Sequence, residues 1–439
     1  MGGARGWGHR VLDIGLLTAG PIDKLFDLAR DFHMSRFLTR DGKLLFLTRT
    51  VRLFAYGFLS VVLTLYLVQA GLTDRQVGLL LTLTLVGDTA VTLWITLVAD
   101  RIGRRKMLLL GAGLMVIAGV VFALTNNFFI LVVAGIIGTI SPSGGEVGSF
   151  LSIEQAILSQ TTPNEHRTRV FAWYNLVGSF ATAAGSLASG LLTQMLQGAG
   201  TTAFQSYRFV LIGYGLLGAV LGLCFLKLSE AAEVNQKITH PKTSRFGLHR
   251  SQKVVLKLSS LFMVDSFAGG LLVQSLLAYW FVVRFGVNPA VLGGIFFAGN
   301  ILAGFSALLA ARMAERFGLI NTMVFTHIPS NILLMLIPLM PGLPLAIIVL
   351  LLRFSISQMD VPTRQSYVMA VVDPDERSAA AGITAIVRTA SSSMSPFVTG
   401  LFFANALFGS PFFLAGGLKI IYDLALFYNF RQLKPPEEK

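Results

Sequence analysis

The sequence contains little charge and almost no cysteine. Only 13% of its 439 residues are charged and 54% are hydrophobic, with a mean hydropathy of +0.70. This balance excludes a water-soluble globular domain. Cys224 is the single cysteine, which excludes an intramolecular disulfide and a metal site built from paired cysteines, and we interpret it as a small buried side chain. The chain also lacks a His-Glu-x-x-His motif and a phosphate-cradling loop, so we expect no enzyme, no cofactor and no metal.

Long apolar runs make up most of the chain. A helix needs about 20 predominantly apolar residues to cross a bilayer. Twelve suitable runs alternate with short polar breaks, at 45–69, 77–98, 107–125, 128–158, 170–195, 207–227, 254–284, 290–313, 321–340, 344–370, 379–404 and 411–430. The 44 glycines are spread through these runs, as expected where helices approach closely in lipid. The pattern predicts an all-α membrane protein with twelve transmembrane helices.

Positive charges gather in alternate breaks. Basic residues crowd the segment before the first run, every second break and the tail, whereas the intervening breaks hold little more than Arg75, Arg208 and Arg284. By the positive-inside rule, both termini and the central loop are predicted to be cytoplasmic, which agrees with an even number of spans. Topology therefore explains the net charge of +13, and we expect no nucleic-acid partner. We expect a multi-pass protein of a cell membrane, either plasma or inner.

The polar segments divide the chain into five predicted parts. These are a cytoplasmic N-terminal segment (1–43), a six-helix bundle (44–228), a cytoplasmic central loop (229–252), a second six-helix bundle (253–430) and a cytoplasmic tail (431–439). Residues 22–38 alternate apolar and charged positions at helical spacing, which predicts an interfacial helix. The alternative is that the native chain starts at Met34 rather than Met1.

The two bundles repeat each other. "AERFG" (314–318) matches "ADRIG" (99–103), and "GVNPAVLG" (286–293) matches "GLTDRQVG" (71–78), both at an offset of 215 residues. Such spacing indicates a duplicated six-helix unit. Two six-helix halves, a long central loop and the stretch "ADRIGRRK" between the second and third runs together resemble the major facilitator superfamily over about residues 44–430.

In that family, the loop after the second helix is a cytoplasmic gate. Its acid pairs across the halves with the end of the eleventh helix or a nearby cation, and an acid at a helix N-terminus gains about 0.3–1 kcal/mol, enough to bias an equilibrium. The resemblance therefore implies a latch, with a partial copy in the second half, made of Asp100, Arg101, Gly103, Arg105 and Lys106 and of Glu315, Arg316 and Gly318. The run 128–158 contains no basic residue, which argues against the drug/proton antiporter branch.

Charged residues inside the spans are candidate site residues, because burying charge in lipid is costly. The family resemblance implies a cavity lined by the first, fourth, seventh and tenth helices, and most of these charges fall there. We predict a substrate and proton cavity formed by Arg49, Arg52, Asp88, Glu146, Asp265, Arg353, Asp360 and Arg388. The stretch "SPSGG" (141–145) interrupts the fourth run beside Glu146, as in helices whose freed backbone lines a cavity.

Several charges also have structural interpretations. The alternative for Arg49 and Arg52 is that they snorkel to the interface, and for Glu154 and Arg364 that they form salt bridges near helix ends. Asp88 is alternatively paired with Arg388, Lys419 with Asp423 one turn away, and His327 is a packing residue.

The leading hypothesis is a monomeric secondary active transporter in the lipid bilayer that works by alternating access. Buried acids such as Glu146, Asp265 or Asp88 would bind the coupling proton, and the arginines favour a small anionic or polar substrate. One alternative is proton-coupled efflux of lipophilic or cationic compounds, which predicts an apolar cavity without arginine. A non-transporting membrane receptor is the other alternative. Such a receptor usually has a long cytoplasmic tail, and the tail "RQLKPPEEK" is too short to support it.

Overall fold

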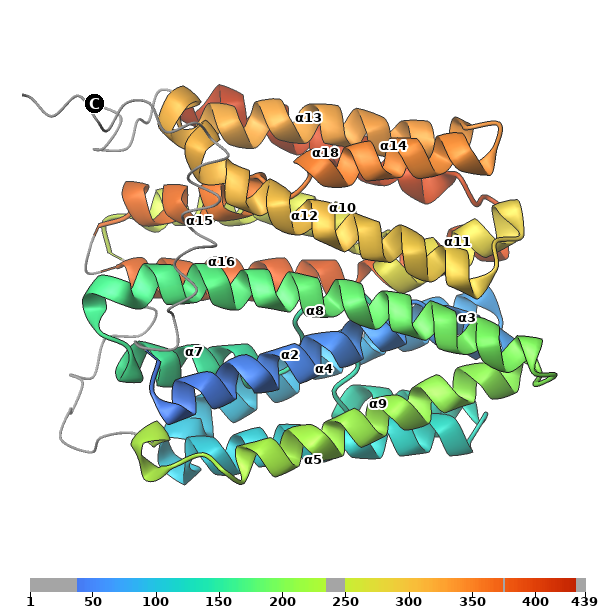
Figure 1. The fold of residues 1–439 in the computed structure, drawn as a ribbon. Helices are drawn as coiled ribbons and strands as arrows, with labels where there is room; N and C mark the ends of the chain where they lie inside the picture. The colour runs from blue at the N-terminus through green and yellow to red at the C-terminus, as the bar shows by residue number, and fades with distance from the viewer. Residues whose placement is uncertain (1–37, 234–248, 374–375, 432–439) are drawn as a thin grey trace, which may run out of the picture.

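Two stacked helical halves form the protein, one from each repeat (Figure 1). The computed structural model describes residues 38–233, 249–373 and 376–431, and these ranges contain helices and turns without strands. The expected interfacial helix (22–38) and the tail beyond residue 431 lie outside the described residues.

The helices of the first half fill the residues between Thr39 and Ala232 with short connections. They are α2 (Arg40–Ser60), α3 (Leu63–Gln69), α4 (Asp74–Ile102), α5 (Arg104–Leu124), α6 (Phe128–Ile137), α7 (Phe150–Thr161), α8 (Asn164–Gly198), α9 (Ala203–Phe225) and the short 3-10 helix η3 (Glu230–Ala232).

The second half repeats this order. Its helices are α10 (Gln252–Gly270), α11 (Gln274–Phe285), α12 (Pro289–Phe317), α13 (Leu319–Leu336), η4 (Ile337–Leu339), α14 (Leu343–Ile356), α15 (Asp360–Val371), α16 (Arg377–Ser393), α17 (Ser395–Ala404) and α18 (Ser410–Phe430). In the described ranges, nine helical segments are long and apolar enough to span a membrane, or ten when bent α2 and α3 count as one. With the pairs α6/α7 and α16/α17, this is consistent with the predicted twelve spans.

The two copies of the sequence motif have matching geometry. Gly103 ends α4 and Gly318 ends α12, with φ of 118° and 83°, values that favour glycine. Each also donates its N–H to an alanine carbonyl four residues earlier, at 2.9 and 2.8 Å. We call the end of the bundle that carries these two glycines the motif end, and the opposite end the sealed end.

The first, fourth, seventh and tenth spans, each of which begins a group of three, are broken. The interruptions lie at 61–62, 138–149, 271–273 and 357–359, and α2 and α3 are bent by 42°. The sequence predicted only the second, where the structure confirms that "SPSGG" is not helical. Pro362 lies in the first turn of α15, where a missing N–H costs no helical bond, and it marks the fourth break.

Glycines bring helices into backbone contact inside each half. A Cβ on Gly57 of α2 would lie 2.1 Å from the Thr182 carbonyl oxygen of α8, and one on Gly270 of α10 would lie 2.4 Å from the Ser392 carbonyl oxygen of α16. The contact of α10 with α16 in the second half is thus equivalent to the contact of α2 with α8 in the first half. Close packing of this kind gives each half a rigid interior.

The halves meet at the sealed end. There Gly78 of α4 packs on Gly400 of α17, and Gly293 of α12 packs on Gly190 of α8. The Tyr279 hydroxyl donates to Asp74 Oδ1 across the same seam (2.9 Å). One hydrophobic core includes residues of both halves at this end. A separate core around Phe262 and Tyr367 lies in the motif-end part of the second half. The halves are therefore joined at the sealed end and parted at the motif end.

Gly293→Ala should loosen the sealed end. The added Cβ would lie 2.8 Å from the Ser186 carbonyl oxygen and 3.0 Å from Gly190 Cα, so the backbones must separate. Overpacking costs about 1–3 kcal/mol, which corresponds to a rise of about fivefold to about 150-fold in the population open at this end. The rate at which an impermeant thiol reagent labels Ser60→Cys in a Cys224→Ser chain measures it. The control is Gly294→Ala, which meets nothing within 4 Å; equal labelling in the two glycine variants would contradict the prediction.

Candidate functional site

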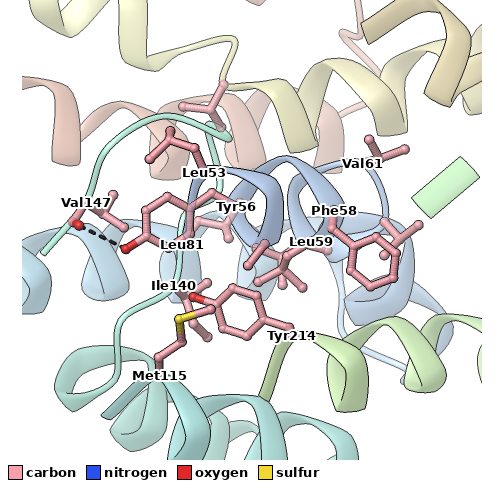
Figure 2. Close-up of a cluster of buried hydrophobic side chains, with 14 of the residues drawn as sticks. Leu53, Tyr56, Phe58, Leu59, Val61, Leu81, Met115, Ile140, Val147 and Tyr214 are labelled. Carbon is pink, nitrogen blue, oxygen red and sulfur yellow. Dashed lines mark hydrogen bonds between the residues drawn. The ribbon is translucent and has the colours of Figure 1, made fainter. Parts of the chain in front are cut away.

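The unwound segment 138–149 lies against buried hydroxyl groups. The Tyr56 hydroxyl donates to the Val147 carbonyl at 3.1 Å, as Figure 2 shows, and the Tyr214 hydroxyl donates to the Thr139 carbonyl at 2.5 Å. The Ser275 N–H of the other half donates to the Pro142 carbonyl (3.0 Å). These donors satisfy carbonyls that a helix would have paired internally, which a bilayer requires.

Arg52 is the centre of a charged cluster in the first half. Its side chain is fully buried. Its Nη2 lies 2.7 Å from Glu154 Oε2 and 3.0 Å from Glu146 Oε1. Tyr174 donates to Glu154 as well, and the Thr48 hydroxyl donates to Glu154 Oε1 at 2.8 Å. The buried guanidinium is therefore balanced by two carboxylates.

Arg49 completes this cluster. It pairs with Glu146, donates to Asn175 Oδ1 at 3.2 Å, and lies over the Tyr174 ring at 4.2 Å. Two cations thus balance two anions inside the first half. Snorkelling is wrong for both arginines, because buried acids outcompete the distant interface.

Asp265 is the centre of a second cluster, in the second half. Three cations approach its carboxylate: Lys419 Nζ at 2.7 Å, Arg388 Nη1 at 2.9 Å and Arg364 Nη1 at 3.3 Å. Arg364 also pairs with Asp360 at 2.6 Å, one turn away on α15. The predicted residues Asp265, Asp360 and Arg388 are thus brought together with Arg364 and Lys419, which the sequence had suggested were structural.

His327 extends the second cluster toward α13. Its Nδ1 lies 2.8 Å from Asp423 Oδ1, and the Asn331 amide donates to Asp423 Oδ2 at 3.2 Å. The expected pair of Lys419 with Asp423 is wrong, because Lys419 points to Asp265 instead. His327 lies in packed surroundings, edge-on to the Tyr422 ring.

The two clusters repeat each other with the charges reversed. Arg52 lies five residues before Gly57, and Asp265 lies five residues before Gly270, the glycine in the equivalent contact. Glu154 and Arg364 are each the fifth residue of their helix, α7 and α15. The pair of Arg52 with Glu154 therefore recurs as a pair of Asp265 with Arg364.

A cavity of about 870 Å³ lies beside the second cluster, between the motif-end parts of α7, α10, α15 and α16. Arg364, Arg377 and Arg388 line it together with glutamine, serine and threonine side chains, and no carboxylate of the described residues does. Arg388 is the most accessible member of the ion-pair cluster, with 29% of its side chain exposed. Gln155 of α7 is the lining residue that comes from the first half.

Two predicted cavity residues stand apart from the ion pairs. Arg353 forms no ion pair in the described ranges, its Nε has no hydrogen-bond partner, and it is not among the lining residues. Asp88 is buried in the middle of α4 and likewise has no ion pair in those ranges. The suggested pair of Asp88 with Arg388 is wrong, since Arg388 is held by Asp265.

The motif residues do not bridge the halves in this conformation. Asp100 has 62% of its side chain exposed and pairs with Arg104 of its own loop at 2.9 Å. The backbone N–H groups of Arg104 and Arg105 donate to Glu233, at 2.7 and 3.1 Å, and Arg104 also donates to Gln160 (2.9 Å). The remaining members Arg101, Lys106, Glu315 and Arg316 lie exposed at this end.

Glu376 binds the start of the second half at the motif end. It accepts from the backbone N–H groups of His249, Arg250 and Ser251, the latter two at 2.8 Å. Burial acts to raise the pKa of Glu376, but the N–H groups of Arg250, Ser251 and His249 outweigh it and lower the pKa to about 2. Sequence reasoning missed Glu376 and Glu233. The signal available for Glu376 was an acid directly before the start of α16, whereas Glu233 is far along the chain from the start of α5 that it binds.

Comparisons with known proteins agree on one family. Residues 45–396 match the family described as Major Facilitator Superfamily. An uncharacterized membrane protein of Saccharomyces cerevisiae is 31% identical over 418 residues, covering 88% of this chain and 93% of that protein.

Solved structures share the fold at low identity. The nucleoside transporter NupG has a TM-score of 0.70 at 15% identity, covering 90% of this chain and 100% of that one. A bacterial homolog of the human lysosomal transporter Spinster, in an inward-facing and unoccupied conformation, has a TM-score of 0.66 at 16% identity, covering 88% and 94%. A D-xylose-proton symporter also has 0.66 at 16%, covering 88% and 97%.

Asp265→Asn should destabilise the second half. It leaves Lys419, Arg388 and Arg364 without their shared anion, and breaking a buried ion pair from one side costs about 3–5 kcal/mol. The apparent unfolding temperature in detergent should fall, and adding Lys419→Met should recover part of the loss. Glu315→Gln, an exposed carboxylate, is the control and should change little. A double variant no more stable than Asp265→Asn would contradict this account.

Glu376→Gln should lower thermal stability in a pH-dependent way. The folded-state pKa of Glu376 lies below its ordinary value of 4.5, so its contribution is present above 4.5 and is lost as pH falls toward about 2. Unfolding temperatures of wild type and variant should therefore differ at neutral pH and converge in acid. Glu230→Gln, an exposed carboxylate, serves as control. A constant difference down to about pH 2 would count against the role of the charged form.

Proposed function

The chain belongs to the major facilitator superfamily, and from this premise we propose that it carries a small anionic or polar solute across a membrane together with protons. The family makes it a multi-pass membrane transporter. The substrate class, the proton coupling and the orientation are our proposals.

The observation that carries the substrate class is the lining of the 870 Å³ cavity. Arg364, Arg377 and Arg388 face it, and no carboxylate of the described residues does. Guanidinium groups bind carboxylates and phosphates through paired hydrogen bonds. The cavity volume falls in the range of about 300–1,000 Å³ common for small-molecule sites. An anion entering here would meet Arg388 first, the most exposed cation of the cluster.

The orientation follows from charge and from conformation. Basic residues are concentrated at the motif end, which by the positive-inside rule makes this end cytoplasmic. The cavity would then be open to the cytoplasm while the glycine seam closes the outer side. A neighbour in fold, the Spinster homolog, was captured inward-facing and unoccupied, which is in keeping with this assignment.

The motif would act when the halves rock. In the present conformation Asp100 is exposed and held by Arg104, so it is free to reach the other half when the motif end closes. We propose that it then pairs across the halves with the end of α16 or a nearby cation, as its family position implies, and that Glu315 and Arg316 form the partial copy of this latch in the second half. The fold neighbour described as a D-xylose-proton symporter supports coupling to protons.

Efflux of lipophilic or cationic compounds is the second candidate. It requires an apolar or acidic cavity, and three lining arginines oppose it.

Small anions should stabilise the purified protein, and Arg388 should be required. A panel of carboxylates, phosphate esters, neutral sugars and nucleosides, and lipophilic cations is tested by thermal unfolding at two pH values. A ligand at 100 times its dissociation constant stabilises by about 2.7 kcal/mol. We expect pH-dependent stabilisation by anions that is lost in Arg388→Gln and retained in Arg284→Gln, an exposed arginine at the sealed end.

Two results would redirect the proposal. Stabilisation by lipophilic cations alone would favour efflux. Anion binding that is lost in Arg353→Gln but kept in Arg388→Gln would place the site at the unpaired arginine of α14 instead of the cavity.

A further inference from the structure

Asp88 is an acid without a counter-charge in the middle of a span. It lies half-way along α4 with 8% of its surface exposed. The other buried carboxylates described at depth in the spans have a basic partner or histidine: Glu146 and Glu154 pair with Arg52, Asp265 and Asp360 with Arg364, and Asp423 with His327. Asp41, in the first turn of α2, is bound by Ser229 instead. A buried carboxylate without a cation is far more stable as the neutral acid.

The helices around Asp88 offer no spare cation. In the described residues, α6 and α17 carry no titratable side chain, and α3 carries only Tyr66. From α7 comes Glu154, already bound to Arg52, and from α16 comes Arg388, already bound to Asp265. The basic residues of α5 all lie at its motif-end start, and Arg377 lies at that end of α16.

The groups that face Asp88 are acids, phenols and backbone. Glu146 lies close enough to interact with it electrostatically, and so do Tyr56 of α2 and Tyr214 of α9. The backbone of Gly148, whose φ of 79° favours glycine, lies close enough to the Asp88 carboxyl group to interact with it. This contact lies within the unwound segment of the fourth span.

Two glycines bring the unwound segment to Asp88. A Cβ on Gly87 would lie 2.3 Å from the Ile136 carbonyl oxygen, and one on Gly135 would lie 2.4 Å from Thr84 Oγ1. The end of α6 is therefore in backbone contact with α4 beside Asp88. The carboxyl group is enclosed by this packing and does not face the arginine cavity, whose lining it does not join.

A row of polar side chains leads from Asp88 to the motif end. Asp88, Thr92, Thr96 and Asp100 follow one another at four-residue spacing, so that neighbours lie one turn apart. The Thr92 hydroxyl is buried without a hydrogen-bond partner, and the Thr96 hydroxyl lies 3.1 Å from the Ser152 hydroxyl of α7.

The hydroxyls of Thr92 and Thr84, one turn either side of Asp88 in α4, are both buried without a hydrogen-bond partner. A helical threonine commonly donates to the carbonyl four residues earlier, as Thr89 does to Leu85 at 2.8 Å on the same helix. Buried hydroxyls are rarely left unpaired. A polar group kept free beside a buried acid fits a group that exchanges hydrogen bonds with water or a passing proton.

We propose that Asp88 binds the coupling proton and that Thr92, Thr96 and Ser152 pass it between Asp88 and the motif end. The inference rests on the proposed function, of which it names the coupling site. In each cycle a proton from water forms an O–H bond on the Asp88 carboxylate, and the same bond breaks when the proton is returned to water. No other bond changes.

The contact of α17 with α4 at the sealed end determines which conformation protonation of Asp88 favours. The Phe397 N–H of α17 donates to Thr82 Oγ1 (2.9 Å), less than two turns from Asp88. Opening the sealed end separates α17 from α4, admits water to this part of α4 and allows Asp88 to ionise. Protonation therefore favours the present conformation, and raising the pH shifts the population away from it.

The first test measures conformation and needs no substrate. Ala385, a cavity-lining residue, is replaced by cysteine in a Cys224→Ser chain, and its rate of labelling is followed between about pH 5 and about pH 8. Each rate is divided by the rate of the same cysteine in the unfolded chain at the same pH, because the reactive thiolate fraction itself rises with pH. We expect this normalised rate to fall several-fold as pH rises, and the isosteric Asp88→Asn to hold it at the acid value at every pH. A pH dependence of the normalised rate that survives in Asp88→Asn would overturn the proposal.

The second test observes the proton itself by infrared spectroscopy. The folded wild type should show the C=O band of a protonated carboxyl group that is missing in Asp88→Asn. In heavy water, Thr92→Val should slow the isotope shift of this band about tenfold, and Thr89→Val, its matched control, should not. No carboxyl band, or equal rates in the two threonine variants, would refute the site or the path respectively. Neither readout depends on the ligand panel, so failure here leaves the Arg388 result standing, and the reverse also holds.

Discussion

A bilayer supplies no water to a charge buried in it, and each half of this protein meets that constraint internally. Arg52 is neutralised by Glu146 and Glu154, and Asp265 is neutralised by Lys419 and two arginines. The ion pair lies at the same place in both repeats, but the acidic and the basic residue have exchanged positions. What the duplication preserved is therefore the balance of charge at that depth rather than the identity of the residues.

Glycine packing makes each half rigid enough to hold these pairs. Gly57 and Gly270 allow backbone contact at equivalent places inside the two halves, of α2 with α8 and of α10 with α16, and the second contact holds together the two helices that carry Asp265 and Arg388. Gly78 and Gly293 make a second set of close contacts, this time between the halves. The same residue type thus fixes the interior of each half and closes the sealed end, and only the second set has to open.

The sequence predicted the elements that depend on local pattern. It did not predict contacts between residues that are far apart in the chain. Hydropathy indicated the spans, and the match of "AERFG" to "ADRIG" indicated the repeat, which recurs as the geometry of Gly103 and Gly318. Partners of charges were largely missed, because Arg52 and Glu154 are 102 residues apart and nothing local selects one acid over another. Three of the four helix breaks escaped notice because, unlike "SPSGG", they lack a cluster of proline and glycine at the break itself.

Charge balance inside each half has a consequence for switching. In the described ranges every ion pair lies within one half. The hydrogen bonds that cross the seam include Gln274 to Ser60 (2.8 Å) and Phe397 to Thr82, which join neutral groups, and Tyr279 to Asp74, whose carboxylate is only partly buried. Each contributes about 0.5–1.5 kcal/mol net and can be exchanged for water. Separating the halves therefore unpairs no buried charge, and a transporter built this way can change conformation on the modest energies of one proton and one solute.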